Sequence, residues 1–105
     1  MEKLYYIYII RTQNNSLYTG ISTDVKRRIT EHNASPKGAK FIKAFKIVKI
    51  ELILECLGRS NASKIEWYIK QLPKQKKEMF LKSPLEFLEK ISEYLNISTK
   101  ISTLN

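Results

Sequence analysis

The sequence has a single cysteine and no long apolar segment. Cys56 has no second thiol with which to form an internal disulfide, so it fits a reducing compartment. It follows the apolar run LILE, where a small buried hydrophobe is expected in preference to a catalytic thiol. No apolar run approaches the roughly 20 residues that span a bilayer. No charged leader followed by an apolar stretch is present either. We therefore expect a cytoplasmic protein.

Acidic residues are also scarce. The chain has 10 Asp and Glu residues against 19 Lys and Arg residues, for a formal net charge of +9. A surface with this excess attracts anions, so nucleic acid is the first partner class and an anionic membrane surface is the competing one. Because no apolar run is long enough to span a bilayer, we expect no membrane partner.

The apolar pattern predicts a small sheet. A length of 105 residues with 43% hydrophobic content suits one compact domain. Aromatic and β-branched runs at residues 4–10 and 16–21 predict the two strands of a hairpin, joined by TQNN. IVKIELILE at residues 47–55 predicts a third strand, which we expect at the buried centre of the sheet.

Three segments have the spacing of amphipathic helices, namely residues 23–33, 60–72 and 83–95. Thr23 and Ser60 suit the N-cap positions of the first two. SPLE opens the third as a capping box with proline at the first helical position. The sequence therefore predicts an α+β fold in which helices flank a small three-stranded antiparallel or mixed sheet.

The C-terminal part reads as an extension of this domain. We expect residues 1–82 to form its main body, with a short basic helix near residues 38–46. Residues 83–105 would add a helix for packing or dimerisation and a frayed polar tail within the same domain. The oligomeric state stays open.

Charged residues border the apolar faces of the predicted helices. Arg28 and His32 are one turn apart and flank the stripe of Val25 and Ile29, so we expect them at the rim of the sheet. Arg27 points about a quarter-turn away and suits contact with a phosphate backbone. On the second long helix, a glutamate at position 66 lies at the edge of the apolar stripe. It is either a solvated flank residue or a ligand.

The predicted hairpin is rich in tyrosine. Four tyrosines lie in two short strands, at positions 5, 6, 8 and 18. Aromatic residues favour strands, so by composition alone core packing explains them better than function does. Gly20 is more informative, because glycine inside a strand marks a bulge or the close approach of another group.

These positions resemble the GIY-YIG nuclease domain. The resemblance rests on Tyr6-Ile7-Tyr8, Tyr18-Thr19-Gly20, then Arg28, His32 and Glu66 at the family's spacing, and covers residues 4 to about 80. SLYTGISTDVKRRITEHN and GAKFIKAFKIVKIEL are similar to small bacterial proteins called the UPF0213 group. Tyr6 and Thr19 differ from the named motif, and Ile21 stands where related excision-repair nucleases have a lysine.

The resemblance implies an endonuclease that hydrolyses phosphodiester bonds in DNA with one divalent ion, Mg²⁺ or Mn²⁺. Tyr8 and Tyr18 would position the attacking water and help to deprotonate it. Arg28 would stabilise the charged phosphate, Glu66 would hold the metal and His32 would assist proton transfer. Tyr6, Ile7 and Gly20 would be structural parts of the motif. A non-catalytic nucleic-acid-binding module on the same fold is the alternative.

The tyrosine roles have two physical requirements. The pKa of tyrosine is ordinarily near 10, so Tyr8 acts as a base only if a metal, His32 or another cation lowers it. With a two-residue turn at Asn14–Asn15, Tyr8 and Tyr18 would point to opposite faces. A shared site therefore predicts an odd-length loop or a bulge, for example at Gly20.

The basic residues are candidates for contact with a nucleic-acid strand. Besides Arg27, the candidates for nucleic-acid contact are Lys26, Lys37, Lys40 and Lys43, and the lysine series continues to Lys46 and Lys49. This series of lysines is explained equally well by a solvated protein face and by binding to the phosphate backbone of a nucleic acid. Lysine without Asn, Gln or Arg partners predicts low sequence specificity.

Overall fold

The computed structural model describes residues 2–34 and 46–102. Its sheet is antiparallel, with strand order β2-β1-β3-β4. The strands are β1 (Leu4–Thr12), β2 (Leu17–Ser22), β3 (Ile47–Leu57) and β4 (Lys100–Ile101). The helices are α1 (Val25–Ala34), α3 (Arg59–Gln71), α4 (Lys74–Lys82) and α5 (Pro84–Leu95). None of the helices in the described ranges is long and apolar enough to cross a membrane.

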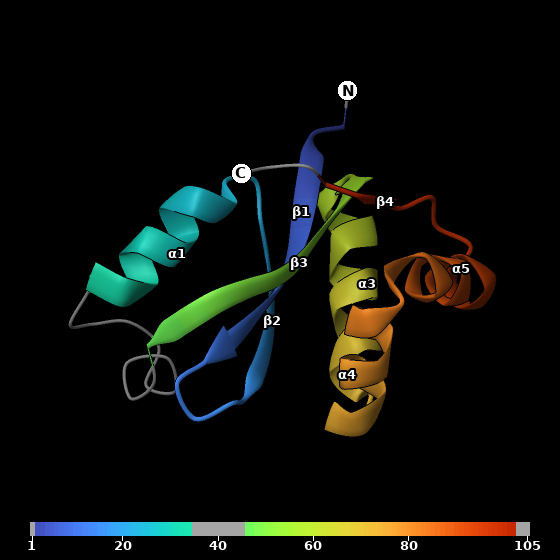
Figure 1. The fold of residues 1–105 in the computed structure, drawn as a ribbon. Coiled ribbons are helices and arrows are strands. Elements are labelled where there is room, and N and C mark those ends of the chain that lie inside the picture. Colours follow the sequence, from blue (N-terminus) through green and yellow to red (C-terminus); the bar gives the residue numbers. More distant parts are fainter. Residues whose placement is uncertain (1, 35–45, 103–105) are drawn as a thin grey trace.

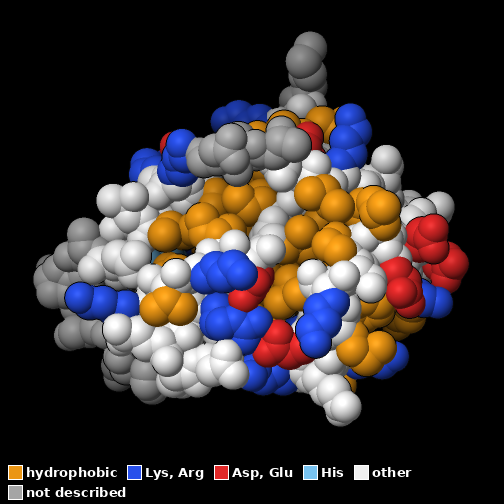
Figure 2. Space-filling view, in the orientation of Figure 1, with side chains coloured by type: hydrophobic (Ala, Val, Ile, Leu, Met, Phe, Trp, Pro, Cys, Tyr) orange, Lys and Arg blue, Asp and Glu red, His pale blue; other side chains and the backbone are white. Residues whose placement is uncertain are grey.

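The predicted α+β class is confirmed, and two expectations about the sheet are wrong. The sheet has four strands instead of three, and β1 instead of β3 lies between two long partners. The first half of β3 is solvent-exposed, with Val48 57% and Ile50 42% accessible, so this strand is buried only from Leu52 onward. On the face shown in Figure 2, hydrophobic side chains gather across the middle of the molecule, and positive and negative side chains alternate below them.

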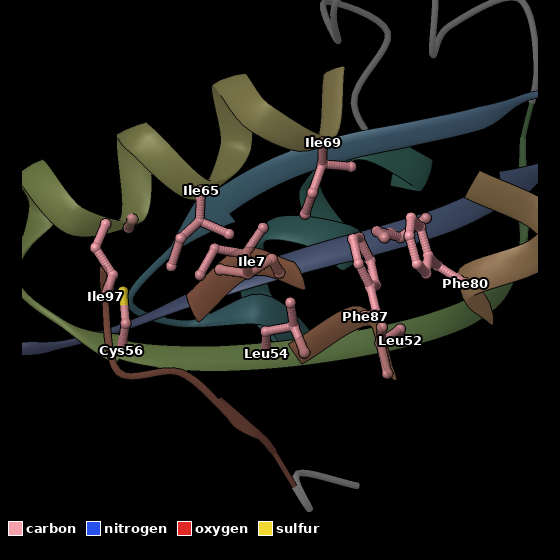
Figure 3. Packing of buried hydrophobic residues seen from close by; sticks show 12 residues of the cluster. Ile7, Leu52, Leu54, Cys56, Ile65, Ile69, Phe80, Phe87 and Ile97 are labelled. Carbon is pink, nitrogen blue, oxygen red and sulfur yellow. The ribbon is translucent and has the colours of Figure 1, made fainter. Parts of the chain in front are cut away.

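The sheet is covered on both faces (Figure 1). Alternate residues of β1 point to opposite sides. Ile7 and Ile9 pack with residues of α3, α4 and α5 in the larger cluster, part of which Figure 3 shows between α3 and the sheet. Tyr8 belongs to the smaller cluster on the α1 side, with Val25 and Ile53. The strand at the centre of the fold therefore supplies both cores.

The hairpin loop has three residues. In the β1–β2 register, Tyr8 lies opposite Gly20 and Arg11 opposite Leu17. The amide of Asn15 donates to the Thr12 carbonyl at 2.9 Å, and Asn15 takes the left-handed conformation with φ 67°. This is a three-residue hairpin connection in which a turn is followed by a left-handed residue. The expected odd-length loop is confirmed, and the pairing continues without a bulge at Gly20.

Two of the expected helix caps are wrong. Asp24, and not Thr23, caps α1, because its carboxylate accepts from the amide of Arg27 at 3.1 Å. The helix α3 begins one residue before the expected Ser60, after Gly58 at φ 86°. At α5, Ser83 occupies the N-cap position as expected but makes no side-chain cap hydrogen bond.

The C-terminal segment is ordered through residue 102, so the expectation of fraying is wrong there. Phe87 of α5 stacks on Phe80 of α4 with ring centroids 4.6 Å apart. Ile97 is buried in the larger core, and β4 pairs with Leu54 and Glu55. A polar composition hid these contacts, because two apolar residues, Ile97 and Ile101, attach the tail to the core. The expected short basic helix near residues 38–46 lies almost wholly outside the described residues.

Candidate functional site

Tyr8 is the buried centre of the site. It is 2% exposed on β1, and its ring passes directly over Gly20 of β2. A Cβ at position 20 would collide with the Tyr8 hydroxyl and ring, so only glycine fits under this side chain. Gly20 thus marks a close approach, one of the two readings that the sequence left open.

Side chains from three other elements act on the Tyr8 hydroxyl. Burial raises the pKa of Tyr8 above its ordinary value of 10.0, and a hydrogen bond from Arg28 of α1 opposes that rise. Tyr18 of β2 and Glu66 of α3 add smaller electrostatic effects that raise the pKa further. The structure therefore brings Tyr8, Tyr18, Arg28 and Glu66 into one electrostatic neighbourhood.

Tyr18 reaches this neighbourhood because of the loop length. It is two residues before Gly20 on β2, and Gly20 lies opposite Tyr8. Residues two apart on a strand share a face, so both tyrosines point to the same side of the sheet. A two-residue loop would have sent them to opposite sides.

The expected role of Tyr8 as a base depends on the balance of these effects. A nearby cation was required to lower the pKa of Tyr8, and Arg28 does lie beside it. Burial nevertheless outweighs the guanidinium, so the net pKa is raised and Tyr8 stays protonated at neutral pH. Without a bound metal ion, its hydroxyl can therefore donate a hydrogen bond and is a poor base.

His32 lies one helical turn after Arg28 on α1 and is half-buried. Burial lowers its pKa below the ordinary 6.5, the charge of Arg28 lowers it further, and Glu31 opposes both. The imidazole is consequently neutral at pH 7 and able to accept a proton. Arg28 itself is more exposed than the sheet-rim position expected from its helical spacing.

Glu66 is the carboxylate whose charge acts on the Tyr8 hydroxyl. Its side chain is 23% exposed, and its Oε2 forms an ion pair with Lys70 Nζ at 3.3 Å. The described residues include no cluster of three or more His, Cys, Asp or Glu side chains suited to a metal. A single carboxylate beside phenolic oxygens is still a hard-oxygen donor set of the kind Mg²⁺ takes together with waters and phosphate oxygens.

The predicted phosphate contacts are distributed unevenly. Lys26 is exposed on α1. Arg27 is exposed too, but its guanidinium pairs with Glu31 at 3.1 Å and with Asp24 at 3.8 Å, so it is less available than expected. Lys37, Lys40 and Lys43 lie outside the described residues.

The other motif residues are structural in position. Ile7 is fully buried under α3, and Tyr6 packs against the α1-side core. Thr19 is buried as well, and its hydroxyl finds no hydrogen-bond partner among the residues the structure describes. These residues shape the strand pair that carries Tyr8 and Tyr18.

One residue of the site was missed by the sequence interpretation. Arg59, the first residue of α3, lines a pocket of about 230 Å³ together with Arg27 and Arg28. The sequence signal was present in Gly58-Arg59, because a glycine directly before a helix allows the positive φ with which the chain turns into that helix. The misplaced cap at Ser60 hid it.

Comparisons with known proteins show which family the chain is similar to. The family model for the GIY-YIG catalytic domain matches residues 4–79. A UPF0213 protein of Fusobacterium nucleatum subsp. nucleatum is 41% identical over 96 residues, covering 91% of this chain and 95% of that protein. A UPF0213 protein of Desulfotalea psychrophila is 42% identical over 79 residues, covering 75% of this chain and 72% of the relative.

A solved structure is similar too. The solution NMR structure of a UPF0213 protein from Bacillus halodurans is 35% identical, with a TM-score of 0.45, and the match covers 75% of this chain and 83% of the other. The family match spans most of the present sequence and includes the strands and helices that hold Tyr8, Tyr18, Arg28 and Glu66. The chain therefore belongs to the GIY-YIG family, a family of nuclease domains, and to its UPF0213 group.

Proposed function

We propose that this protein is a metal-dependent endonuclease that hydrolyses phosphodiester bonds in DNA with low sequence specificity. The observation that supports the proposal most directly is the set of groups acting on the Tyr8 hydroxyl, which come from β2, α1 and α3. Membership of the GIY-YIG family supports it independently. The excess of basic residues fits an anionic polymer as substrate.

Arg28 is the group that stabilises phosphate charge in this proposal. A phosphodiester gains negative charge on its oxygens as water attacks, and a guanidinium matches two of those oxygens at once. Arg28 forms no ion pair with a carboxylate among the described residues, so its charge is not neutralised within that part of the protein. The Tyr8 oxygen accepts from Arg28 and thereby orients the guanidinium.

The two proton roles fall to different residues. Tyr8 stays protonated, so its O–H positions a phosphate oxygen or the attacking water by donating to it. His32 is neutral at pH 7 and serves as the proton acceptor, directly or through Tyr18. The opposite pKa shifts of these two residues, both caused first by burial, separate donor from acceptor.

Glu66 would hold the divalent ion, Mg²⁺ or Mn²⁺. When bound there, the ion would supply charge stabilisation for the phosphate and a water of lowered pKa. One carboxylate is a normal protein contribution for Mg²⁺. Lys70 now pairs with Oε2 of Glu66, so ion binding competes with this salt bridge or uses the other carboxylate oxygen.

Cleavage by the purified full chain tests the proposal. Supercoiled plasmid, single-stranded DNA, branched duplex and an RNA strand are incubated with Mg²⁺, Mn²⁺ or a chelator, and products are separated by electrophoresis. We expect nicking of DNA only when metal is present. Arg28→Ala should lower the cleavage rate by about 100-fold or more, because its main contribution is made in the transition state. Oligonucleotide affinity in chelator should change only a few-fold.

Lys82→Ala is the matched control, since Lys82 is an exposed cation at the end of α4. It should leave cleavage unchanged. Glu66→Gln should abolish cleavage and keep binding in chelator. Equal losses of binding and rate in Arg28→Ala would contradict its assignment.

A non-catalytic nucleic-acid-binding module is the second candidate. The Lys70 ion pair favours it, because the salt bridge satisfies Glu66 without a metal. Absence of cleavage on every substrate, with binding that Glu66→Gln does not change, would select this alternative.

A further inference from the structure

A polar pocket lies beside the site, where β2 runs into α1 and α3 begins. It has a volume of about 230 Å³, and its lining includes Ser22 and Thr23 at the end of β2 and the guanidinium-bearing residues Arg27, Arg28 and Arg59. None of the described residues that line it is acidic. We call it the arginine pocket.

The backbone fixes where Arg59 stands. The amide of Gly58 donates to the Lys3 carbonyl at 2.8 Å, which anchors the start of α3 beside β1. Gly58 has φ 86°, a left-handed conformation that lets the chain turn sharply from β3 into the helix. Arg59 follows as the first helical residue. Its entry into the pocket is therefore set by the turn between β3 and α3.

The other two arginines reach the pocket from α1. Asp24 caps that helix through the Arg27 amide, which sets the direction of its first turn. Arg27 is partly neutralised by Glu31 and Asp24. Arg28 and Arg59 form no ion pair with a carboxylate among the described residues, so the pocket has positive charge without a matching acid in this part of the chain.

We propose that the arginine pocket binds a second phosphodiester of the same nucleic-acid strand, adjacent to the one acted on beside Tyr8. Arg28 belongs to both places, since it lines the pocket and hydrogen-bonds with Tyr8. Two binding positions that share one arginine are close enough to hold consecutive phosphates of one strand. The strand then passes the end of β2, from the start of α3 to α1. This inference rests on the proposed function.

A phosphodiester strand suits these guanidinium groups better than another anion of the same charge does. Each presents parallel N–H donors that match two phosphate oxygens, and the Ser22 and Thr23 positions add short polar side chains at the pocket wall. A phosphodiester in a nucleic-acid strand, unlike a carboxylate side chain, is followed by a second phosphate at a fixed spacing along the strand. It can therefore engage Arg59 and the Tyr8 group together.

Short oligonucleotides separate one phosphate from two. In chelator, ¹H–¹⁵N spectra of the full chain are titrated with TpT, which has one phosphodiester, with TpTpT, which has two, and with pTpT, which has one phosphodiester and a terminal phosphate. The wild type should bind TpTpT more tightly than TpT by roughly tenfold, the worth of one charge-assisted contact. Arg59→Ala should lose most of that preference.

Lys64→Ala is the matched control, because Lys64 is an exposed cation on the same helix that does not line the pocket. It should keep the preference for TpTpT. Arg59→Lys, which retains the charge without the two-pronged geometry, should fall between wild type and Arg59→Ala. The same spectra show whether each variant is folded.

Two results would overturn the inference. If Arg59→Ala keeps the full TpTpT preference, the pocket does not hold the second phosphate. If Arg59→Ala weakens the binding of pTpT but not of TpTpT, the pocket takes a terminal phosphate and not an internal one. These titrations need no metal and no cleavage, so a failure of the endonuclease proposal in the plasmid assay would be seen separately.

Discussion

At the scale of single residues, glycine and burial decide the chemistry of the site. Gly20 has no side chain, so the Tyr8 ring lies against its backbone. This contact removes Tyr8 from water, and the loss of water raises the pKa of its hydroxyl. The identity of one small residue on β2 therefore contributes to the raised pKa of a tyrosine on β1.

We predict an acid limit on cleavage that belongs to His32. Its folded pKa is below 6.5, so the imidazole stays neutral as pH falls through 6.5 and becomes protonated only at lower pH. The cleavage rate should hold down to about pH 6.5 and then fall. His32→Gln should cleave more slowly than the wild type at pH 7, and its cleavage rate should not fall in this way at lower pH. A pH–rate profile under single-turnover conditions measures it.

Glu31→Gln is the companion variant. Glu31 raises the pKa of His32, so its neutralisation should move the acid limit to lower pH. The lowered pKa of His32 in the wild type also affects folding. The folded protein binds fewer protons at His32 than the unfolded chain does, so the free energy of unfolding declines as pH falls below 6.5. An unchanged acid limit in His32→Gln would show that another group controls the rate.

At the scale of elements, an ion-pair network ties the hairpin to the C-terminal helices. Arg11 of β1 donates to Glu51 of β3 at 2.5 Å and to the two carboxylate oxygens of Glu78 of α4 at 2.9 and 2.7 Å. The β1–β3 register shifts between Ile9 and Ile10, directly beside this network. The shift allows Glu51 to meet Arg11 across the strands, and α4 closes the arrangement.

We predict that this network makes stability depend on acid. Arg11 and Lys74 lower the pKa of Glu78 from 4.5 to about 2, with Arg11 as the larger cause. A depressed folded pKa means that the stabilisation is present above pH 4.5 and is lost as pH falls towards 2. Glu78→Gln should unfold at lower denaturant concentration than wild type at pH 7, and the two should converge near pH 2.

Urea unfolding followed by circular dichroism across this pH range is the measurement. Glu89→Gln is the control, since Glu89 is exposed on α5 and forms no ion pair with another described residue. It should follow the wild type at every pH. A gap between Glu78→Gln and wild type that persists at pH 2 would contradict the prediction.

The element pattern also shows the limit of periodicity. The helices at residues 23–33, 60–72 and 83–95 were predictable because apolar residues recur every three to four positions along them. The central place of β1 was not predictable, because both β1 and β3 are rich in apolar residues and their order in the sheet depends on which neighbours pair with them. The strand β4 has two residues, too few for a period to be read.

At the scale of the whole molecule, the formal charge of +9 governs association. We predict that binding to a single-stranded oligonucleotide in chelator weakens linearly on a plot of log affinity against log salt. The slope should be about −0.7 for each phosphate contacted, because bound cations are released from the strand. Fluorescence anisotropy at several salt concentrations measures it. Salt-insensitive association that requires lipid vesicles would contradict a nucleic-acid role and favour a membrane surface.

The sequence by itself predicted the three long strands, three of the helices and the basic charge, and its resemblance to the GIY-YIG domain gave the candidate residues Tyr8, Tyr18, Arg28, His32 and Glu66. It did so because periodicity and motif spacing are local properties of the chain. The two tyrosines can share a face of the sheet only with an odd-length loop between their strands, and the structure has one.

Only the tertiary structure decided how these residues act. Burial of Tyr8 over Gly20 raised the pKa of its hydroxyl, and the turn at Gly58 placed Arg59 in the same pocket as Arg28. Both outcomes depend on the distance between segments far apart in the chain. A pKa responds to everything packed around a group, and a pocket exists only where several elements meet, so neither follows from the spacing of residues along one strand or helix.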